Sequence, residues 1–267
     1  MELSVIKSKW TNPMKAGTEE GVKAWDSVAY DYVHKEITFE NNSFLQLMES
    51  KIDLSPDMSV LDVGCGAGAY SIALAPRVGK AVGVDFSPKM IELAKDLAAK
   101  TGISNAEFYQ CDWYKCDGSD YKGKYDVVFA HTTPAVADYD TFMKMAEAAK
   151  KYCFICKPTR RTDMVLDKLS EMAGRKPHGS DDSIAYMFDI LWEMGFEPEI
   201  TYEKTTWCNE KDLETAKPWY LGRLKSFGTL DEGKEQEIIR YLEDIAVEGQ
   251  VSETINTTLV SISWKVG

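Results

Sequence analysis

Three glycines, Gly64, Gly66 and Gly68, follow an apolar run over residues 60–63. Glycine allows a sharp turn between a strand and a helix, and it lets a ligand approach the backbone closely. In an open parallel sheet, ligands bind at the carboxyl ends of the strands. This spacing favours a ligand-binding turn over a purely structural one, and we expect Cys65 within it as a small residue at a crowded position.

Asp62 lies two residues before Gly64, and its charge indicates which kind of ligand the turn holds. The pattern Gly64-x-Gly66-x-x-Ala69 also satisfies the looser form of the dinucleotide fingerprint. A carboxylate beside the turn repels a diphosphate, whereas it attracts a cationic amino-acid group through charge-assisted hydrogen bonds. S-adenosylmethionine carries an ammonium and a sulfonium but no phosphate, so Asp62 favours that cofactor over NAD(P).

Two further acidic residues follow the next two predicted strands. Asp85 comes about 20 residues after the turn, where an acid accepts hydrogen bonds from both ribose hydroxyls; its alternative role is to cap the helix that begins after Ser87. Asp112 is placed to accept from the adenine amino group, with Trp113 packing on the ring, and its alternative is an ordinary turn residue. Acids at three successive strand ends predict an adenosine-containing cofactor more specifically than the glycines alone.

His131 directly follows the fourth predicted strand, near the expected position of a transferred methyl group. It is a candidate general base or substrate hydrogen-bond donor, and equally a packed loop histidine. Arg160 and Arg161 follow the fifth strand and suit bidentate binding of an anionic substrate, although solvated surface charge is the stronger alternative. Methyl transfer from a sulfonium is an in-line displacement that requires alignment and no protein nucleophile.

The six cysteines do not indicate a metal site. Cys153 and Cys156 have a metal-ligand spacing, but side chains three apart on a regular strand face opposite sides. There is no second pair of this kind, so we expect no bound metal and free thiols in a reducing compartment.

The elements that would position these residues alternate between strand and helix patterns. The strands are predicted at 59–63, 80–84, 106–110, 125–130, 152–156, 199–207 and 257–266. The helices are predicted within 15–50 and at 88–101, 142–151 and 183–194, with a polar helical stretch over about 210–247. This alternation is typical of a parallel sheet covered by helices on both faces.

Composition narrows the class of protein. Hydrophobic residues at 44% and charged residues at 28% fit a globular domain, and the net charge of −12 argues against nucleic acid as the main partner, because phosphate binding requires clustered Lys and Arg. No apolar run reaches the roughly 18 residues of a membrane span, and residues 1–10 lack the apolar stretch of a signal peptide. We expect a cytoplasmic protein that does not bind membranes, built as a single domain over 1–267, with an N-terminal helical cap segment over 1–50 and a helical insertion over 208–250 between the last two strands.

These motifs resemble the class I S-adenosylmethionine-dependent methyltransferases, in particular the small-molecule branch that includes ubiquinone and menaquinone biosynthesis enzymes. The resemblance covers residues 25–156: residues 25–32 are similar to the branch's aromatic-Asp-x-x-Ala-x-x-Tyr signature, 61–68 to the first family motif, and 125–130 to the fourth. It implies an α/β fold, a Rossmann-like three-layer αβα sandwich with a mainly parallel seven-stranded sheet, an antiparallel last strand and a helical cap.

The resemblance also implies roles for individual residues. Tyr32 would contact the methionine end of the cofactor, and the backbone of Ala130 would lie beside it. The full expected set of cofactor-binding residues is Tyr32, Asp62, Gly64, Cys65, Gly66, Gly68, Asp85, Phe86, Met90, Asp112, Trp113 and Ala130.

The implied activity is transfer of a methyl group from S-adenosylmethionine to a small-molecule acceptor, by a monomer or homodimer. The sequence departs from the family pattern at 156–161, where no Gly-Gly turn follows the fifth strand, and in the long insertion; the acceptor is therefore not implied. Two alternatives remain: a non-catalytic S-adenosylmethionine-binding regulatory protein and, less favoured, an NAD(P)-dependent oxidoreductase.

Overall fold

The computed structural model describes residues 2–11, 18, 21–22, 25–26, 29–32, 36–176, 182–225 and 228–267, without the side chains of Asp31 and Tyr32. Its α-helices are α1 (Leu3–Lys9), α3 (Ser43–Lys51), α4 (Ala69–Leu74), α5 (Pro88–Thr101), α6 (Tyr139–Ala148), α7 (Met164–Met172), α8 (Asp182–Glu193), α9 (Leu213–Lys225) and α10 (Glu232–Ile245). Short 3-10 helices are η1 (Ala29–Tyr32), η2 (Ala75–Arg77) and η3 (Gly118–Asp120). The strands are β1 (Ser59–Val63), β2 (Lys80–Asp85), β3 (Ala106–Gln110), β4 (Tyr125–His131), β5 (Ala149–Asp163), β6 (Glu199–Asp212) and β7 (Gln250–Lys265).

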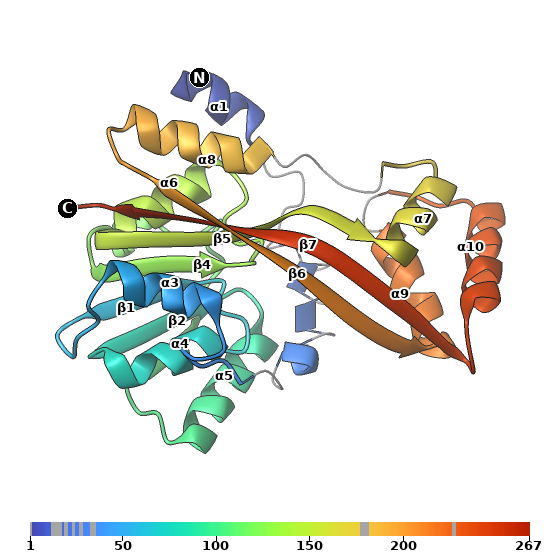
Figure 1. Cartoon of the computed structure of the whole chain (residues 1–267), viewed down its shortest axis with the longest axis horizontal. Helices are drawn as coiled ribbons and strands as arrows, with labels where there is room; N and C mark the ends of the chain where they lie inside the picture. Colours follow the sequence, from blue (N-terminus) through green and yellow to red (C-terminus); the bar gives the residue numbers. More distant parts are fainter. Residues whose placement is uncertain are drawn as a thin grey trace. The chain divides into compact units, whose positions relative to one another are not determined.

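The strands form a seven-stranded sheet in the order β3-β2-β1-β4-β5-β7-β6. The four pairings from β3 to β5 are parallel. β7 is antiparallel to β5. The amide of Val266 donates to the carbonyl of Lys151 (2.7 Å), and the hydroxyl of Thr159 donates to the carbonyl of Thr258 (3.1 Å). Residue numbers therefore decrease along β7 in the direction in which they increase along β5. The arrow of β7 in Figure 1 accordingly points opposite to those of β4 and β5. The predicted mainly parallel sheet with an antiparallel last strand is confirmed.

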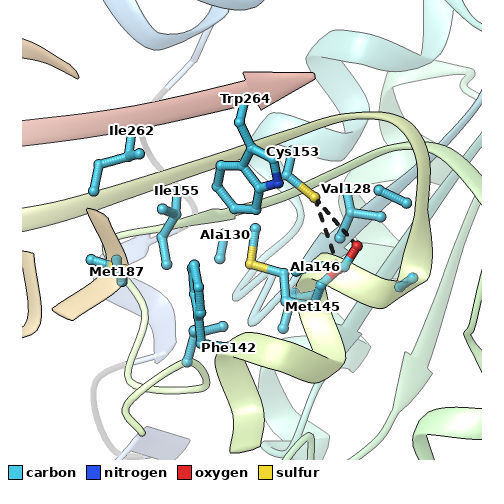
Figure 2. Packing of buried hydrophobic residues seen from close by; sticks show 14 of the residues in the cluster. Val128, Ala130, Phe142, Met145, Ala146, Cys153, Ile155, Met187, Ile262 and Trp264 are labelled. Atoms are coloured by element: carbon cyan, nitrogen blue, oxygen red, sulfur yellow. Dashed lines mark hydrogen bonds between the residues drawn. The ribbon is translucent and has the colours of Figure 1, made fainter. Parts of the chain in front are cut away.

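Helices cover both faces of the sheet (Figure 1). On one face, α1, α6 and α8 bury a large apolar cluster, in which Phe142 and Met145 of α6 pack against Ile155 of β5 and Trp264 of β7 (Figure 2). On the other face lie α3, α4 and α5, with Phe44 of α3 in ring contact with strand residues. The predicted three-layer αβα arrangement is therefore confirmed.

Cys153 belongs to the buried cluster in Figure 2, with its sulfur 3.9 Å from the carbonyl of Met145. Burial raises the pKa of this thiol well above its usual value. Cys153 and Cys156 are both outside any disulfide, and both are buried in the core.

Local sequence explains why α5 begins and ends where predicted. The hydroxyl of Ser87 accepts from the amide of Met90 (3.0 Å), and Pro88 occupies the first helical position, where no amide hydrogen is needed. Gly102 closes the helix with φ of 70°, a conformation that glycine adopts without steric cost. α5 thereby presents its apolar side to the sheet beside the glycine turn.

Several elements differ from the predicted ones. The predicted helix over 142–151 ends at 148, because Ala149 already pairs with Tyr125 of β4. β5 and β6 extend to 163 and 212, so that residues 210–212 are strand and not helix. Residues 36–42 are not helical, and the sequence patterns did not indicate α7.

The chain divides into two compact units, one formed by residues 1–157, 182–201 and 260–267 and the other by residues 158–181 and 202–259. The second unit has its own core, built from apolar residues of α7, α9 and α10 together with Val251. It includes the predicted insertion over 208–250 and also α7, which sequence patterns did not group with it. Among the helices of the described residues, none has both the length and the apolar character that crossing a bilayer requires.

Candidate functional site

The glycine turn between β1 and α4 has left-handed backbone at each of its three glycines, with φ of 74°, 52° and 82° at Gly64, Gly66 and Gly68. The amides of Gly64 and Cys65 donate to the carbonyl of Val84 (2.8 and 3.0 Å), which ties the turn to the end of β2. A Cβ on Gly66 would meet only the sulfur of Met90, at 3.9 Å. The backbone at Gly66 therefore faces open space, as an approaching ligand requires.

Asp85, at the carboxyl end of β2, is 9% exposed. Its two carboxylate oxygens accept from the amides of Gly66 (3.0 Å) and Ser87 (2.9 Å). Burial raises the pKa of this carboxyl above its usual value, and these backbone hydrogen bonds oppose that shift. The hydrogen bond from Gly66 joins Asp85 to the turn, so the two form one rigid unit. Each oxygen retains a further lone pair for a ligand hydroxyl.

A hollow adjoins Asp85 and brings together several of the predicted residues. It is lined by Gly64, Val84, Asp85, Phe86, Cys111, Asp112, Trp113, Tyr114, Pro134 and Ala135. Asp112 accepts from the amide of Tyr114 (3.1 Å) and forms an ion pair with Lys115 (3.0 Å). The acids expected at the ribose and at the adenine thus border the same hollow.

Trp113 differs from the expected stacking residue. Its indole N–H donates to the carbonyl of Thr141 (3.1 Å), and Tyr121 packs against its ring at 4.9 Å between centroids. Trp113 is consequently a core residue with one edge on the hollow. Ala130 is fully buried within β4 and does not line this hollow.

Asp62 is more deeply buried than a residue expected to bind a cofactor directly. It is 2% exposed and accepts from the hydroxyl of Ser71 (2.8 Å). Burial raises its pKa to about 7, and the same burial raises the pKa of the neighbouring Cys65 thiol well above its usual value. Any influence of Asp62 on a ligand therefore acts from beneath the turn through its ionised form, which a pKa of about 7 leaves only partly populated at neutral pH.

His131, at the end of β4, belongs to a hydrogen-bonded chain that the sequence did not reveal. Asn42 caps α3 with its Oδ1, which directs its Nδ2 to donate to the hydroxyl of Tyr70 (3.1 Å). That hydroxyl lies 3.0 Å from His131 Nε2, and the hydroxyl of Thr132 lies 3.1 Å from Nδ1. While accepting from Asn42, the Tyr70 hydroxyl has its own proton available to donate to Nε2, an arrangement that corresponds to the imidazole tautomer with its proton on Nδ1.

The environment of His131 keeps its imidazole neutral. The rings of Phe44 and Tyr70 lie 4.8 and 4.3 Å from the His131 ring between centroids. Burial lowers the pKa of His131 to about 4. A base with so low a pKa accepts a proton poorly at neutral pH, so this geometry favours positioning of an acceptor over general-base catalysis.

Lys157 is a second residue that the sequence analysis missed. Its ammonium donates to the backbone carbonyls of Thr133 (3.0 Å) and Val136, and burial lowers its pKa to about 8. Thr133 in turn packs on the glycine turn, because a Cβ on Gly64 would lie 2.0 Å from the Thr133 hydroxyl. Lys157 therefore holds the loop that covers Gly64. The available signal was a lysine directly after the apolar strand predicted at 152–156.

The N-terminal segment reaches the same region through residues that the family signature includes. Asp26 accepts from the hydroxyl of Ser87 at 2.5 Å. Ala29 is buried with Ala67 and Met90, and Trp25 packs against this cluster. The predicted contact of Tyr32 concerns a side chain outside the described residues.

Arg160 and Arg161 lie in the second compact unit. Arg161 pairs with the buried Asp163 (3.1 Å), and its guanidinium lies 5.9 Å from the centroid of the Trp207 ring. Arg160 is exposed and has left-handed backbone with φ of 46°. Arg161 is thus engaged within its own unit, and the predicted anion-binding role remains untested for both arginines.

Two relatives share part of this sequence. An uncharacterised protein of Haemophilus influenzae is 25% identical over 182 residues, which cover 68% of this chain and 66% of that protein. A 23S rRNA (uracil(1939)-C(5))-methyltransferase of Alcanivorax borkumensis is 36% identical over 89 residues, which cover 33% of this chain and 19% of that enzyme. The chain therefore matches less than two thirds of the length of each relative.

A solved structure shows the same fold. Phosphoethanolamine N-methyltransferase 2 of Haemonchus contortus, in complex with phosphomonomethylethanolamine and S-adenosylhomocysteine, superposes with a TM-score of 0.51 at 15% identity, covering 93% of this chain and 57% of that chain.

The family is shown by a broader match, to a family model described as a methyltransferase domain. This match extends over residues 54–211, from just before β1 to the end of β6, and so includes the glycine turn, Asp85, Asp112 and His131. Because it covers more than half of the chain, the chain belongs to the methyltransferase-domain family.

Proposed function

We propose that this methyltransferase uses S-adenosylmethionine to methylate a small-molecule acceptor. The observation that carries the proposal is Asp85, whose carboxylate is held by the amides of Gly66 and Ser87 at the edge of a hollow, with further lone pairs available for ribose hydroxyls. The open backbone at Gly66 fits close approach of the same ligand. The solved Haemonchus enzyme, which has the same fold, holds S-adenosylhomocysteine.

Each residue of the site has a proposed task. Asp85 orients the ribose, and Asp112 accepts from the adenine amino group. Gly64, Gly66 and Gly68 let the backbone pass close to the cofactor, with Cys65, Phe86, Met90 and Ala130 forming the surrounding wall. Asp62, in its ionised form, attracts the ammonium group from beneath the turn.

S-adenosylmethionine supplies an electrophilic methyl group on a sulfonium. The chain's own contribution is alignment of the acceptor and exclusion of water. Neutral His131 and the Tyr70 hydroxyl, which lies 3.0 Å from Nε2, orient a polar acceptor group. We further propose that residues 1–50 and 208–250 form a cap; a single domain over 1–267 and a cytoplasmic location stay predictions from the sequence.

The acceptor class rests on charge and on the extent of the match. The net charge of −12 disfavours a polyanionic substrate. The rRNA methyltransferase of Alcanivorax aligns over only 19% of its own length. These observations favour a small-molecule acceptor over RNA, as does the binding of phosphomonomethylethanolamine, a small molecule, by the Haemonchus enzyme.

The first prediction concerns cofactor binding. Asp85→Ala should weaken binding of S-adenosylhomocysteine by roughly 1.5–3 kcal/mol, the scale of hydrogen bonds to a charged group, measured by titration calorimetry. Asp126→Ala is the matched control: Asp126 also accepts a backbone amide, that of Ser59 (2.8 Å), but at the amino end of β4. Equal affinities in both variants would remove Asp85 from the site.

Turnover separates the remaining alternatives. Formation of S-adenosylhomocysteine with a panel of small-molecule acceptors supports the proposed enzyme. Binding without turnover across that panel favours a regulatory protein, methylation of a 23S rRNA fragment contradicts the acceptor class, and tighter binding of NADH contradicts the cofactor.

A further inference from the structure

β6 is the last strand in the sheet order, and 14 residues make it unusually long for an edge strand. Most of its residues are exposed. Within the described ranges, β7 is the neighbour of β6 and no strand follows on its outer edge. Native proteins normally shorten, cover or interrupt such an edge, because its free backbone groups pair readily with another strand.

Four of the six charges of β6 occur as two Glu-Lys pairs, at 203–204 and at 210–211, and the other two are Glu199 and Asp212. When two copies of such a strand run antiparallel about a central residue, each residue lies opposite one equally far from the centre. With Trp207 at the centre, Glu203 lies opposite Lys211 of the second copy, and Lys204 lies opposite Glu210 of the second copy. The two-fold symmetry repeats both contacts, so every one of these charges faces its opposite.

Neighbouring registers lose this match. A shift by one residue would turn every side chain to the opposite face, so the nearest two-fold registers shift by two residues. One of them has only the contact between Lys204 and Asp212, and the other brings no two charges opposite each other. Like charges directly opposite each other destabilise a strand pair, whereas opposite charges stabilise it. The register centred on Trp207 therefore brings the largest number of opposite charges together.

The two faces of β6 are compatible with this pairing. The hydroxyl of Thr206 donates to Asn256 (2.8 Å), which places even-numbered residues of β6 beside even-numbered residues of β7 on one face. On that face Lys204, Glu210 and Cys208 are exposed. On the other face Trp207 is half-buried, and its symmetry mate would face it as a cross-strand aromatic pair.

We propose that β6 pairs antiparallel with β6 of a second copy of this chain, centred on Trp207, so that the sheet continues across a homodimer. Protective charges alone would explain a charged edge, but they require no particular order. The repeated Glu-Lys order is the one that antiparallel self-pairing requires. This inference is independent of the cofactor and the acceptor.

Charge reversal tests the register. Sedimentation velocity at micromolar concentrations should show a dimer for the unmodified chain. Lys204→Glu places glutamates opposite each other at both symmetry-related contacts and should weaken dimerisation about tenfold or more. Lys204→Glu combined with Glu210→Lys restores opposite charges at these contacts and should restore the dimer. Circular dichroism checks that each variant is folded.

Two outcomes of that series would overturn the proposal. One is a monomer for the unmodified chain across the micromolar range. The other is a dimer that the double variant weakens as much as the single one, which would indicate an interface elsewhere.

Cross-linking gives a second, geometric readout. In the proposed register Thr206 lies opposite Cys208 of the second copy, so Thr206→Cys should form an intermolecular disulfide under mild oxidation, seen as a reducible dimer band. Tyr202→Cys, also exposed and on the same face, is the matched control and should add nothing to the background of the unmodified chain. Equal cross-linking of both variants would contradict the register.

Discussion

At the scale of single residues, Gly64 and Gly66 have similar backbone conformations but different surroundings. A methyl group on Gly64 would collide with Thr133, whereas one on Gly66 would meet only Met90 at 3.9 Å. We predict that Gly64→Ala lowers the free energy of unfolding by about 2–4 kcal/mol, through strain and overpacking. Gly66→Ala should lower it by only about 1 kcal/mol, from backbone strain, but should weaken S-adenosylhomocysteine binding about tenfold, since the methyl group occupies the ligand's approach. Denaturant unfolding and calorimetry measure the two effects, and an unchanged affinity for Gly66→Ala would show that the ligand does not approach there.

At the scale of elements, a buried pair of acidic residues makes the stability of the second unit depend on pH. Glu253 of β7 is 2% exposed; burial and the neighbouring Asp163 raise its pKa to about 7, while the pKa of Asp163 is lowered. A carboxyl with a raised pKa retains its proton in the fold, so its stabilisation is lost as pH rises from about 4.5, its ordinary value, to 7. We predict that Glu253→Gln raises the melting temperature at pH 8, and that this advantage shrinks towards pH 5. Thermal unfolding across that range is the measurement, and an advantage that stays constant with pH would contradict the shifted pKa.

At the scale of the whole molecule, ligand binding should be felt beyond the glycine turn. Residues 25–32 include Asp26, bonded to Ser87, and Ala29, packed beside Ala67 and Met90. Ordering of these neighbours by a ligand should slow their backbone exchange. We predict that S-adenosylhomocysteine protects residues 25–32 as well as 64–68 from amide exchange, measured by mass spectrometry. Protection of 208–250 in the same experiment would support the proposed cap, and protection confined to 64–68 and Asp85 would contradict a ligand-linked lid.

The sequence by itself determined the sheet strands, the glycine turn and the acids at the strand ends. These features depend on local rules: apolar runs of strand length, glycine between a strand and a helix, and Ser87 with Pro88 at a helix start. Those rules act over a few residues, so the sequence pattern reports them directly. The elements around the glycine turn accordingly match their predicted bounds closely.

Only the tertiary structure decided which side chains act together. Asn42, Tyr70 and His131 are far apart in sequence, and their chain forms because α3, α4 and β4 meet. The end of α6 and the start of β5 follow from pairing with β4, which overrides helix propensity at 149–151. The extension of β5 beyond β4 accompanies its hydrogen bonds to β7 at Thr159. Burial, too, is a property of the packed molecule: it leaves Asp62 beneath the turn, commits Trp113 to the core and keeps His131 neutral. No sequence pattern reports how much water a side chain loses on folding. That loss determines the charge state of the side chain and whether it can contact a ligand.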